Sequence, residues 1–330
     1  MNWLITGGCG FIGKNLLKVL VEFDKDWSVR ILDNLSVGTK EDLYYAVPSE
    51  CVVENDSLEW EKGKVQLFVG DILDDSRSLA AGTGADAVVR LAANTGIPSS
   101  VADPKMDCVT NVIGTLNMLE SCRKNGIKKF VFASSGAPVG ECTPPVHEEL
   151  PCHPVSPYGA SKLAGEGYCS TYYHTFKIDT VALRFGNVYG PGSSNKGSVV
   201  AKFIKQIFAG ETLEIYGDGS QTRDFIYIGD LVKSILLAAT KPNVGGNIFQ
   251  IATNKETDLT TLTNSLVKVM ESKDMKNIKV INGEKRLGDV MRNFSDTSKA
   301  KNVLGWTVEE TLDSGLEKTV DWFVDAYAKV

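Results

Sequence analysis

The stretch Thr6-Gly7-Gly8-Cys9-Gly10-Phe11-Ile12-Gly13 lies between an apolar run at residues 3–5 and a segment, residues 12–23, whose apolar residues recur at helical spacing. This order predicts a buried strand, a glycine turn and a helix. Glycines let the backbone approach a ligand closely, and a helix N-terminus offers free N–H groups and the positive end of a dipole. The turn therefore favours a pyrophosphate, the alternative being a glycine turn that only packing requires.

An acidic residue at the end of the next predicted strand supports a dinucleotide site. Residues 29–32 form that strand, and Asp33 follows it about 20 residues beyond the last glycine, as expected for a carboxylate that binds a ribose. A carboxylate accepts hydrogen bonds from a free 2′-hydroxyl and repels a 2′-phosphate. The sequence therefore predicts NAD and not NADP.

Length and composition limit the class of protein. The chain has 330 residues, is 43% hydrophobic and has a net charge of −6. A chain of this length can bury a large core, and we expect it to divide into two lobes. The charge argues against nucleic-acid binding, and no apolar run is long enough to span a membrane. Nor does a basic, apolar leader precede the first strand.

Cysteine and histidine usage indicates a reducing compartment and no metal site. The seven cysteines are scattered and lack Cys-x-x-Cys spacing, so we expect reduced thiols in a cytoplasmic protein. The three histidines, His147, His153 and His174, do not have the spacing of metal ligands. We therefore expect no bound metal.

Strands and helices alternate through the first half of the chain. Further strands are predicted at residues 65–69, 87–91 and 130–133, with one helix over residues 103–125. Residues 47–64 are rich in acidic side chains and are interpreted as a surface insertion. The alternation predicts an α/β fold with a doubly wound parallel sheet of the Rossmann type, whose ligands bind at the carboxyl ends of the strands.

Residues with the potential for acid–base chemistry follow this unit. Pro157 can begin a helix, which places Tyr158 and Lys162 one turn apart on the same face. A tyrosine of pKa about 10 is only ~0.1% ionised at neutral pH, a deficit of roughly 4 kcal/mol. A nearby ammonium and a positively charged nicotinamide would reduce this deficit, and Ser135 could bind the same substrate oxygen. The alternative is a packed tyrosine beside a solvated lysine.

Together these motifs resemble the extended short-chain dehydrogenases/reductases, in particular the branch of nucleotide-sugar epimerases and dehydratases that includes the UDP-glucose 4-epimerases. The resemblance covers nearly the whole chain. It rests on these segments: Gly7 to Gly13, Asp33-Asn34-Leu35, Gly70-Asp71-Ile72, Leu91-Ala92-Ala93, Asn111 to Thr115, Ser134-Ser135, Tyr158 with Lys162, Arg184 to Pro191, Gly217 to Phe225, and Arg286 to Asp289.

The resemblance implies a division of the chain and a set of binding residues. Residues 1–180 would form the NAD-binding Rossmann domain, with segments near 226–255 returning to it, and residues 181–330 would mainly form a smaller α/β lobe for the nucleotide sugar. NAD would be tightly bound by Gly7, Gly10, Phe11, Ile12, Gly13, Asp33, Asn34, Asp71, Ile72, Leu91, Ala92, Ala93, Asn111, Tyr158 and Lys162. The substrate would contact Ser135, Asn187, Arg223, Arg286 and Asp289.

Physical chemistry agrees with arginines on the diphosphate, because a guanidinium binds phosphate oxygens bidentately at about 1.5–3 kcal/mol for each charge-assisted bond. For Arg223 the alternative is a surface ion pair with Asp224. Arg184 is interpreted as structural. The resemblance also implies a homodimer formed through the helices at residues 103–125 and 157–176.

The implied reaction begins when the ionised Tyr158 removes the proton of a sugar hydroxyl at carbon 4 while NAD is reduced to NADH, leaving a 4-keto sugar. Similar dehydratases and decarboxylases have a glutamate two residues after the serine, and related double epimerases have a cysteine there. This chain has Gly136 and Ala137, which cannot act as acid or base. The prediction is therefore a 4-epimerase, and the resemblance implies UDP-sugars as its substrates. Alternatives are a decarboxylase or dehydratase of the same family, or a non-catalytic NAD-binding sensor or scaffold.

Two departures from the family pattern accompany these matches. Val139 stands where a tyrosine is usual, and we expect it to alter the wall of the sugar pocket. Arg90 replaces a usual histidine and is expected to lie near the cofactor.

Overall fold

The computed structural model describes residues 1–284 and 291–327. In this part of the chain the largest sheet has eight strands, and every neighbouring pair is parallel. From one edge to the other they are β12 (Asn247–Ile251), β7 (Asp179–Phe185), β6 (Lys129–Ser135), β5 (Ala87–Arg90), β1 (Asn2–Thr6), β2 (Ser28–Asp33), β4 (Val65–Val69) and β3 (Val52–Glu54). The predicted Rossmann-type fold is confirmed.

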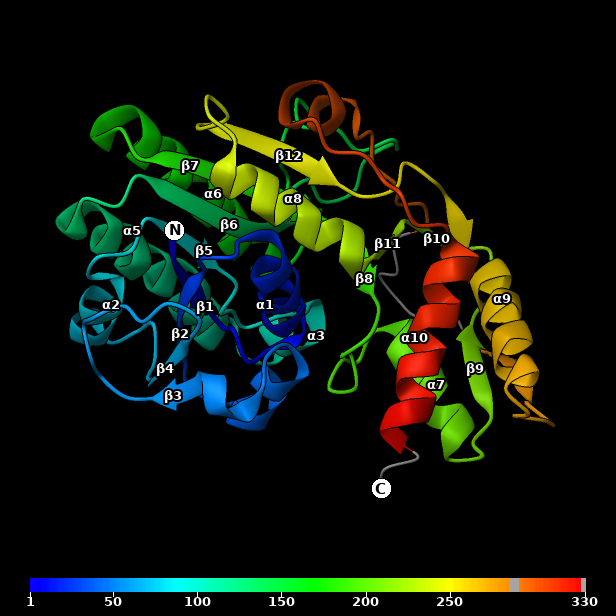
Figure 1. Cartoon of the computed structure of the whole chain (residues 1–330). Coiled ribbons are helices and arrows are strands. Elements are labelled where there is room, and N and C mark those ends of the chain that lie inside the picture. The colour runs from blue at the N-terminus through cyan, green and yellow to red at the C-terminus, as the bar shows by residue number, and fades with distance from the viewer. Residues whose placement is uncertain (285–290, 328–330) are drawn as a thin grey trace.

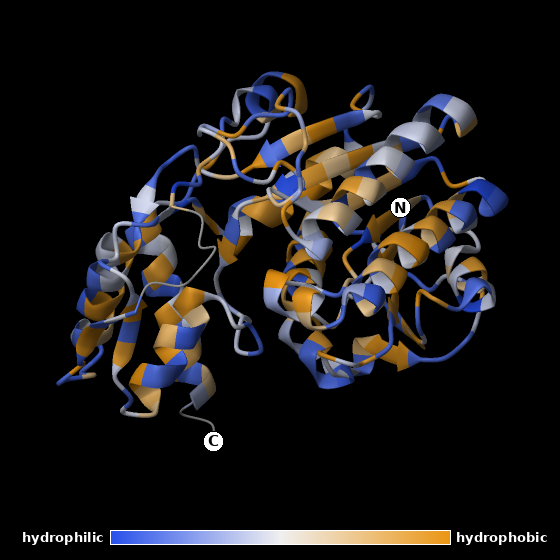
Figure 2. Cartoon of the chain, turned by 180° about the vertical axis from the view of Figure 1, so that it is seen from behind, coloured by the Kyte–Doolittle hydropathy of each residue, from blue (hydrophilic) through white to orange (hydrophobic). Residues whose placement is uncertain are grey.

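Helices cover both faces of this sheet (Figure 1). On one face lie α1 (Phe11–Phe23) and α8 (Ile228–Thr240), which pack on each other. On the other lie α2 (Asp75–Gly82), α3 (Ile97–Ala102), α4 (Pro104–Cys108), α5 (Gly114–Asn125) and α6 (Pro157–Phe176). Figure 2 shows hydrophobic residues concentrated in the strands between the two layers. Because both faces are covered, the strands are apolar runs and not alternating ones.

The remaining elements form a smaller α/β lobe with a hydrophobic core of its own. It contains α7 (Val199–Phe208), β9 (Leu213–Tyr216), α9 (Leu259–Ser272), β14 (Val280–Gly283) and α10 (Leu312–Tyr327). Two short strand pairs connect the lobes: β8 (Asn187–Tyr189) with β11 (Phe225–Tyr227), and β10 (Thr222–Arg223) with β13 (Thr257–Asp258). Short 3-10 or π segments are η1 (Lys40–Tyr45), η2 (Ser49–Cys51), η3 (Val109–Ile113) and η4 (Ala300–Leu304).

Residues 47–64 are more ordered than the predicted surface insertion. Their strand β3 extends the main sheet at its edge by pairing with β4. Trp60 packs over the buried guanidinium of Arg30, with 4.1 Å between the guanidinium carbon and the ring centroid. The acidic composition suggested a surface segment because the outward side chains are charged, but Val52 and Trp60 pack against the hydrophobic core around the main sheet.

The helix predicted over residues 103–125 is interrupted. It comprises α4, one π-helical turn at η3 and then α5. The apolar periodicity predicts a helix but cannot reveal the insertion of one residue, so the π turn could not be predicted from the sequence. No helix in the described ranges has both the length and the apolar character needed to cross a membrane.

Candidate active site

The glycine turn joins β1 to α1 at the carboxyl edge of the sheet. Gly7 has a φ of +70°, and a Cβ atom at this residue would lie 2.6 Å from the backbone nitrogen of Ala92. A Cβ at Gly13 would lie 2.5 Å from the Cα of Gly8. Both positions therefore require glycine, one for backbone conformation and both for close approach. A glycine turn that only packing requires would show the same contacts, so the neighbouring groups must distinguish it from a pyrophosphate-binding turn.

Asp33 lies next to this turn. Its carboxylate accepts hydrogen bonds from the backbone N–H of Cys9 at 3.0 Å and of Leu35 at 2.9 Å. Burial raises the pKa of Asp33, and these two hydrogen bonds oppose the rise. Each carboxylate oxygen has a further lone pair, so the group can still accept hydrogen bonds from a ribose.

Two neighbouring loops complete this edge. Asn34 donates a hydrogen bond from Nδ2 to Asp71 at 2.9 Å, which ties the loop after β2 to the loop after β4. Ile72 is buried against Gly114. Ala92, which donates from its N–H to the carbonyl of Thr6 at 2.9 Å, and Ala93 are half-buried. The structure thus brings together the predicted residues from β1, β2, β4 and β5.

Asn111 holds the loop that follows β5. Its Nδ2 lies within hydrogen-bonding distance of the Asn94 carbonyl at 2.9 Å, Asp107 Oδ1 at 3.0 Å and Ser161 Oγ at 3.1 Å. Its Oδ1 accepts from the N–H of Asn94 at 3.0 Å. The protein thereby uses the hydrogen-bonding groups of this amide, so Asn111 fixes the loop at Asn94 against α4 and α6.

Tyr158 and Lys162 are placed by the start of α6. Ser156 caps the helix, accepting from the N–H of Gly159 at 3.1 Å, and Pro157 occupies the first turn. A Cβ at Gly159 would lie 2.6 Å from the carbonyl oxygen of Ala137, so the helix begins close against the backbone after β6. Tyr158 consequently lies beside Ser135. This proximity is what two residues need if they are to bind the same substrate oxygen, as predicted from the sequence.

The charges around Tyr158 differ from those expected. Lys162 donates from Nζ to the carbonyl of Ala133 at 2.8 Å, and this nitrogen lies 5.6 Å from the centroid of the Tyr158 ring. Burial lowers the pKa of Lys162 well below its usual range. Burial raises the pKa of Tyr158, while the Ser135 hydroxyl and the charge of Arg90 lower it. Burial therefore has the largest effect on this pKa, and among the described groups the cation that lowers it is Arg90 and not Lys162 as predicted.

A buried ion pair supports the strand and helix that carry these residues. Arg184 of β7 binds Glu166 of α6 through Nε and Nη2, both at 2.8 Å, and both side chains are only 2% exposed. Ser134 donates to the same carboxylate at 2.6 Å. Arg184 is therefore structural, as predicted, and it fixes α6 against the strands β6 and β7.

Two of the predicted substrate residues, Asn187 and Arg223, lie in the short strands that connect the lobes. Asn187 is exposed at the start of β8, and Arg223 is half-buried in β10, where its Nη1 donates to the Thr222 carbonyl at 2.7 Å. Asp224 is buried and accepts from the backbone of residues 253, 254 and 295. Its carboxylate therefore organises these loops. Arg286 and Asp289 lie outside the described residues.

The two departures have different environments. Val139 is 1% exposed, so its side chain packs in the interior and does not form an accessible wall of a sugar pocket as we expected. The tight turn at residues 136–140 accounts for this, since the N–H of Val139 bonds to the Gly136 carbonyl and its own carbonyl accepts from His153. Arg90 is fully buried behind Tyr158 and Lys162.

Comparison with known proteins identifies the family. A family model described as "NAD dependent epimerase/dehydratase family" matches residues 3–252. The chain belongs to this family. UDP-glucose 4-epimerase of Mycolicibacterium smegmatis is 35% identical over 328 residues, which are 98% of this chain and 98% of that protein.

Solved structures of such epimerases have the same architecture. UDP-glucose 4-epimerase of Thermotoga maritima, solved with UDP-glucose, is 32% identical with a TM-score of 0.86 and covers 99% of this chain and 100% of its own. UDP-glucuronic acid 4-epimerase of Bacillus cereus, solved with UDP-glucuronic acid and NAD, is 30% identical with a TM-score of 0.85 and covers the same shares.

NAD is the cofactor of this epimerase/dehydratase family member, and the residues at the sheet edge fit it. Gly7 and Gly13 let the turn pack tightly against the backbone of Ala92 and Gly8. The N–H groups of the first turn of α1, which have no acceptor within the helix, would hold the pyrophosphate. The Asp33 carboxylate, held by two backbone N–H groups, has free lone pairs for a ribose.

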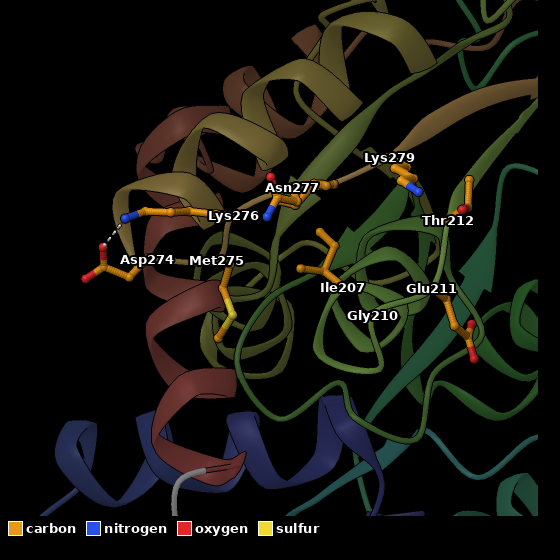
Figure 3. A pocket seen from close by; sticks show the side chains of 10 residues that line it. Ile207, Gly210, Glu211, Thr212, Asp274, Met275, Lys276, Asn277 and Lys279 are labelled. Carbon is orange, nitrogen blue, oxygen red and sulfur yellow. Dashed lines mark ion pairs between the residues drawn. The ribbon is translucent and has the colours of Figure 1, made fainter.

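A separate cavity lies at the far end of the second lobe. It has a volume of about 250 Å³ and is lined by residues 207, 210–212 and 274–279 (Figure 3). Lys276, which lines it, pairs with Asp274 at 3.5 Å. The predicted catalytic residues are absent from its lining, so it is distinct from the site at the sheet edge.

Sequence reasoning missed two buried carboxylates close to the predicted catalytic residues Tyr158 and Lys162. Asp107 is fully buried and bonds to Asn111, and Glu166 holds Ser134 and Arg184. The i, i+4 spacing of Asp107 with Asn111 was a signal for the first. Nothing local marked Glu166, because its partners lie on other elements.

Proposed function

We propose that this protein is an NAD-dependent UDP-sugar 4-epimerase that works through a transient 4-keto sugar. The family and its epimerase relatives support an NAD-dependent enzyme acting on nucleotide sugars. The observation that carries the finer assignment is the convergence of Ser135, Tyr158 and Lys162 beside a turn that has no acid or base at residues 136 and 137.

Each of the three residues has a defined part in the chemistry. The Tyr158 oxygen would take the proton from the hydroxyl at sugar carbon 4 and return it when the alcohol forms again. Ser135 would hydrogen-bond the same sugar oxygen. Lys162, anchored to the Ala133 carbonyl, would fix the position of the tyrosine and of the nicotinamide ribose. NAD, when bound, supplies reversible oxidation at the sugar carbon.

The residues after Ser135 favour epimerisation over elimination or decarboxylation. A Cβ at Gly136 would meet no atom within 4 Å, and Ala137 has only a methyl group. A keto sugar formed here meets no side chain at these positions that could remove a second proton. It can turn over and be reduced on its other face, which inverts carbon 4 and needs no further group.

We also propose that the nucleotide sugar lies between two domains. One is the NAD-binding domain, formed by residues 1–180 and the segment near 226–255, and the other is the substrate lobe, formed mainly by the rest of residues 181–330. Asn187, Arg223, Arg286 and Asp289 would bind the nucleotide, the arginines on the diphosphate and the aspartate on the ribose. Replacing Arg223 with glutamine should raise KM for the UDP-sugar and leave NAD content unchanged.

A homodimer in the cytoplasm is the proposed working form. The helices implied by the family resemblance carry exposed apolar side chains, among them Met106 at 53%, Ile113 at 44% and Phe176 at 40%. Analytical ultracentrifugation of the parent and of a Met106→Glu, Ile113→Glu variant should give a dimer and a monomer. A monomeric parent would contradict this proposal.

A substrate panel tests the function directly. The protein is incubated separately with UDP-glucose, UDP-N-acetylglucosamine and UDP-glucuronate, and the products are identified by NMR. We expect a 4-epimer from at least one of them. Release of CO₂, or a dehydrated keto sugar, would instead assign a decarboxylase or a dehydratase, and an NAD-bound protein without turnover would favour a sensor.

A further inference from the structure

Arg90 is a buried cation at the end of β5. In the sheet its neighbours are Thr6 of β1 and Phe132 of β6, and its side chain is 0% exposed. Its Nη2 donates to the carbonyls of Thr110 at 3.0 Å and Asn111 at 3.4 Å, in the π turn. Within residues 1–284 and 291–327, its Nε and Nη1 atoms have no hydrogen-bond partner.

Such an arrangement is costly for packing alone. A buried charge normally has a carboxylate partner, and none of the described residues pairs with Arg90 in this way. Two carbonyl acceptors satisfy only one of its three nitrogens. A neutral side chain of similar shape would fill the same space without the desolvation penalty, which indicates a role for the charge.

The charge lies directly behind the catalytic pair. Both cations contact the ring of Phe132: the Arg90 guanidinium carbon is 5.6 Å from its centroid and Lys162 Nζ is 5.1 Å from it. Lys162 Nζ is in turn 5.6 Å from the Tyr158 ring centroid. Arg90, Phe132 and Lys162 are all buried from solvent, so the field of Arg90 is weakly screened.

Arg90 is charged at neutral pH despite its burial. Burial lowers its pKa only to about 10, so the guanidinium remains protonated at neutral pH. The pKa of Lys162 falls well below its usual range, first because of burial and next because of Arg90 itself.

The charged and polar groups that face Tyr158 and Lys162 come from several elements. They are Glu166 on α6, Arg90 on β5, Asp107 on α4, Ser135 at the end of β6, and Lys196 in the loop before α7. For Tyr158, Asp107 opposes the effect of Arg90, and Ser135 adds to it.

We propose that Arg90 is a positioning residue that supplies the fixed positive charge stabilising the phenolate of Tyr158, while it also holds the π turn at residues 109–113. The inference rests on the proposed acid–base role of Tyr158. It assigns to an arginine on the strand part of the electrostatic effect that the sequence alone attributed to Lys162.

Four variants separate charge from packing. Arg90→Gln removes the charge and keeps N–H donors for the π turn, and Arg90→Lys keeps a charge. Asp107→Asn removes the opposing charge. Arg30→Gln is the matched control, because Arg30 is equally buried in the same sheet, on β2, which β1 separates from β5, and contacts Trp60 and Phe68.

The main measurement is the ionisation of Tyr158 in NAD-loaded protein without sugar. Phenolate absorbance is titrated against pH, and the same variant carrying Tyr158→Phe is subtracted. This readout does not require turnover, so it stands even if the substrate panel finds no epimerase. The pH dependence of kcat with a sugar that is turned over gives a second readout.

Loss of a unit charge on the order of 10 Å away, at an effective dielectric constant of about 20–40, raises a tyrosine pKa by roughly 0.6–1.2. Arg90→Gln should show this rise and move the acidic limb of kcat to higher pH by the same amount. Arg90→Lys should lie close to the parent, and Asp107→Asn should shift the titration downward.

An unchanged Tyr158 titration in Arg90→Gln, or an equal shift in Arg30→Gln, would overturn the proposal and leave Arg90 a purely structural residue. If Arg90→Gln does not fold, the Asp107→Asn titration decides, because an unmoved Tyr158 pKa there shows that buried charges in this region do not reach the phenol.

Discussion

Replacing Gly7 with alanine should damage both the fold and the NAD site. The residue has a φ of +70°, where an alanine costs about 1–2 kcal/mol. The new methyl would also lie 2.6 Å from the Ala92 nitrogen and 2.7 Å from its Cα. Both are backbone atoms held to Thr6, so they cannot turn aside, and overpacking of this kind costs about 1–3 kcal/mol more.

Gly63→Ala isolates the conformational part of this cost. Gly63 has a φ of +69°, and a Cβ there would meet nothing within 4 Å. The control should therefore lose about 1–2 kcal/mol of unfolding free energy and Gly7→Ala about 2–5 kcal/mol. To relieve the contact, either the turn or the loop at Ala92 must move by a large fraction of an ångström, and displacements near 1 Å can cost on the order of 10²-fold in function.

Urea unfolding gives the two stabilities, and the NAD released on denaturing the purified proteins gives their cofactor content. We expect Gly63→Ala to retain NAD and Gly7→Ala to lose it and to rebind it weakly in a titration. Equal stabilities of the two variants, together with full NAD content in Gly7→Ala, would refute the close-approach argument.

Tyr158→Phe should lower kcat about 10²–10⁴-fold with unchanged NAD content; normal turnover in the product assay would remove the mechanism. Glu166→Gln should lower the free energy of unfolding in urea by about 3–5 kcal/mol, because it leaves Arg184 buried and unpaired. The double variant Glu166→Leu, Arg184→Met should recover part of this loss. If the double variant is the least stable of the three proteins, this reasoning is wrong. In the folded protein iodoacetamide should modify the exposed Cys108 and spare Cys9, whose pKa is raised by burial, and mass spectrometry showing equal labelling would be inconsistent with the described packing.

Local patterns were sufficient to predict most of the elements. The glycine turn, Asp33 and the apolar runs predicted strands β1, β2, β4, β5 and β6 to within about two residues. The Ser156-Pro157 start of α6 is also a local signal, since its cap and first turn lie within four residues. Strand β3 was missed because an edge strand of three residues carries too little apolar pattern.

The sequence by itself determined the parallel α/β fold, the family resemblance, and the choice of Tyr158, Lys162 and Ser135, because each depends on residue types at short, fixed spacings. Only the tertiary structure decided which groups set the charge around Tyr158. Arg90, Asp107 and Phe132 come from three separate elements, and the pKa of a phenol depends on burial and on charges brought close in space. Neither quantity can be read from the order of residues along the chain.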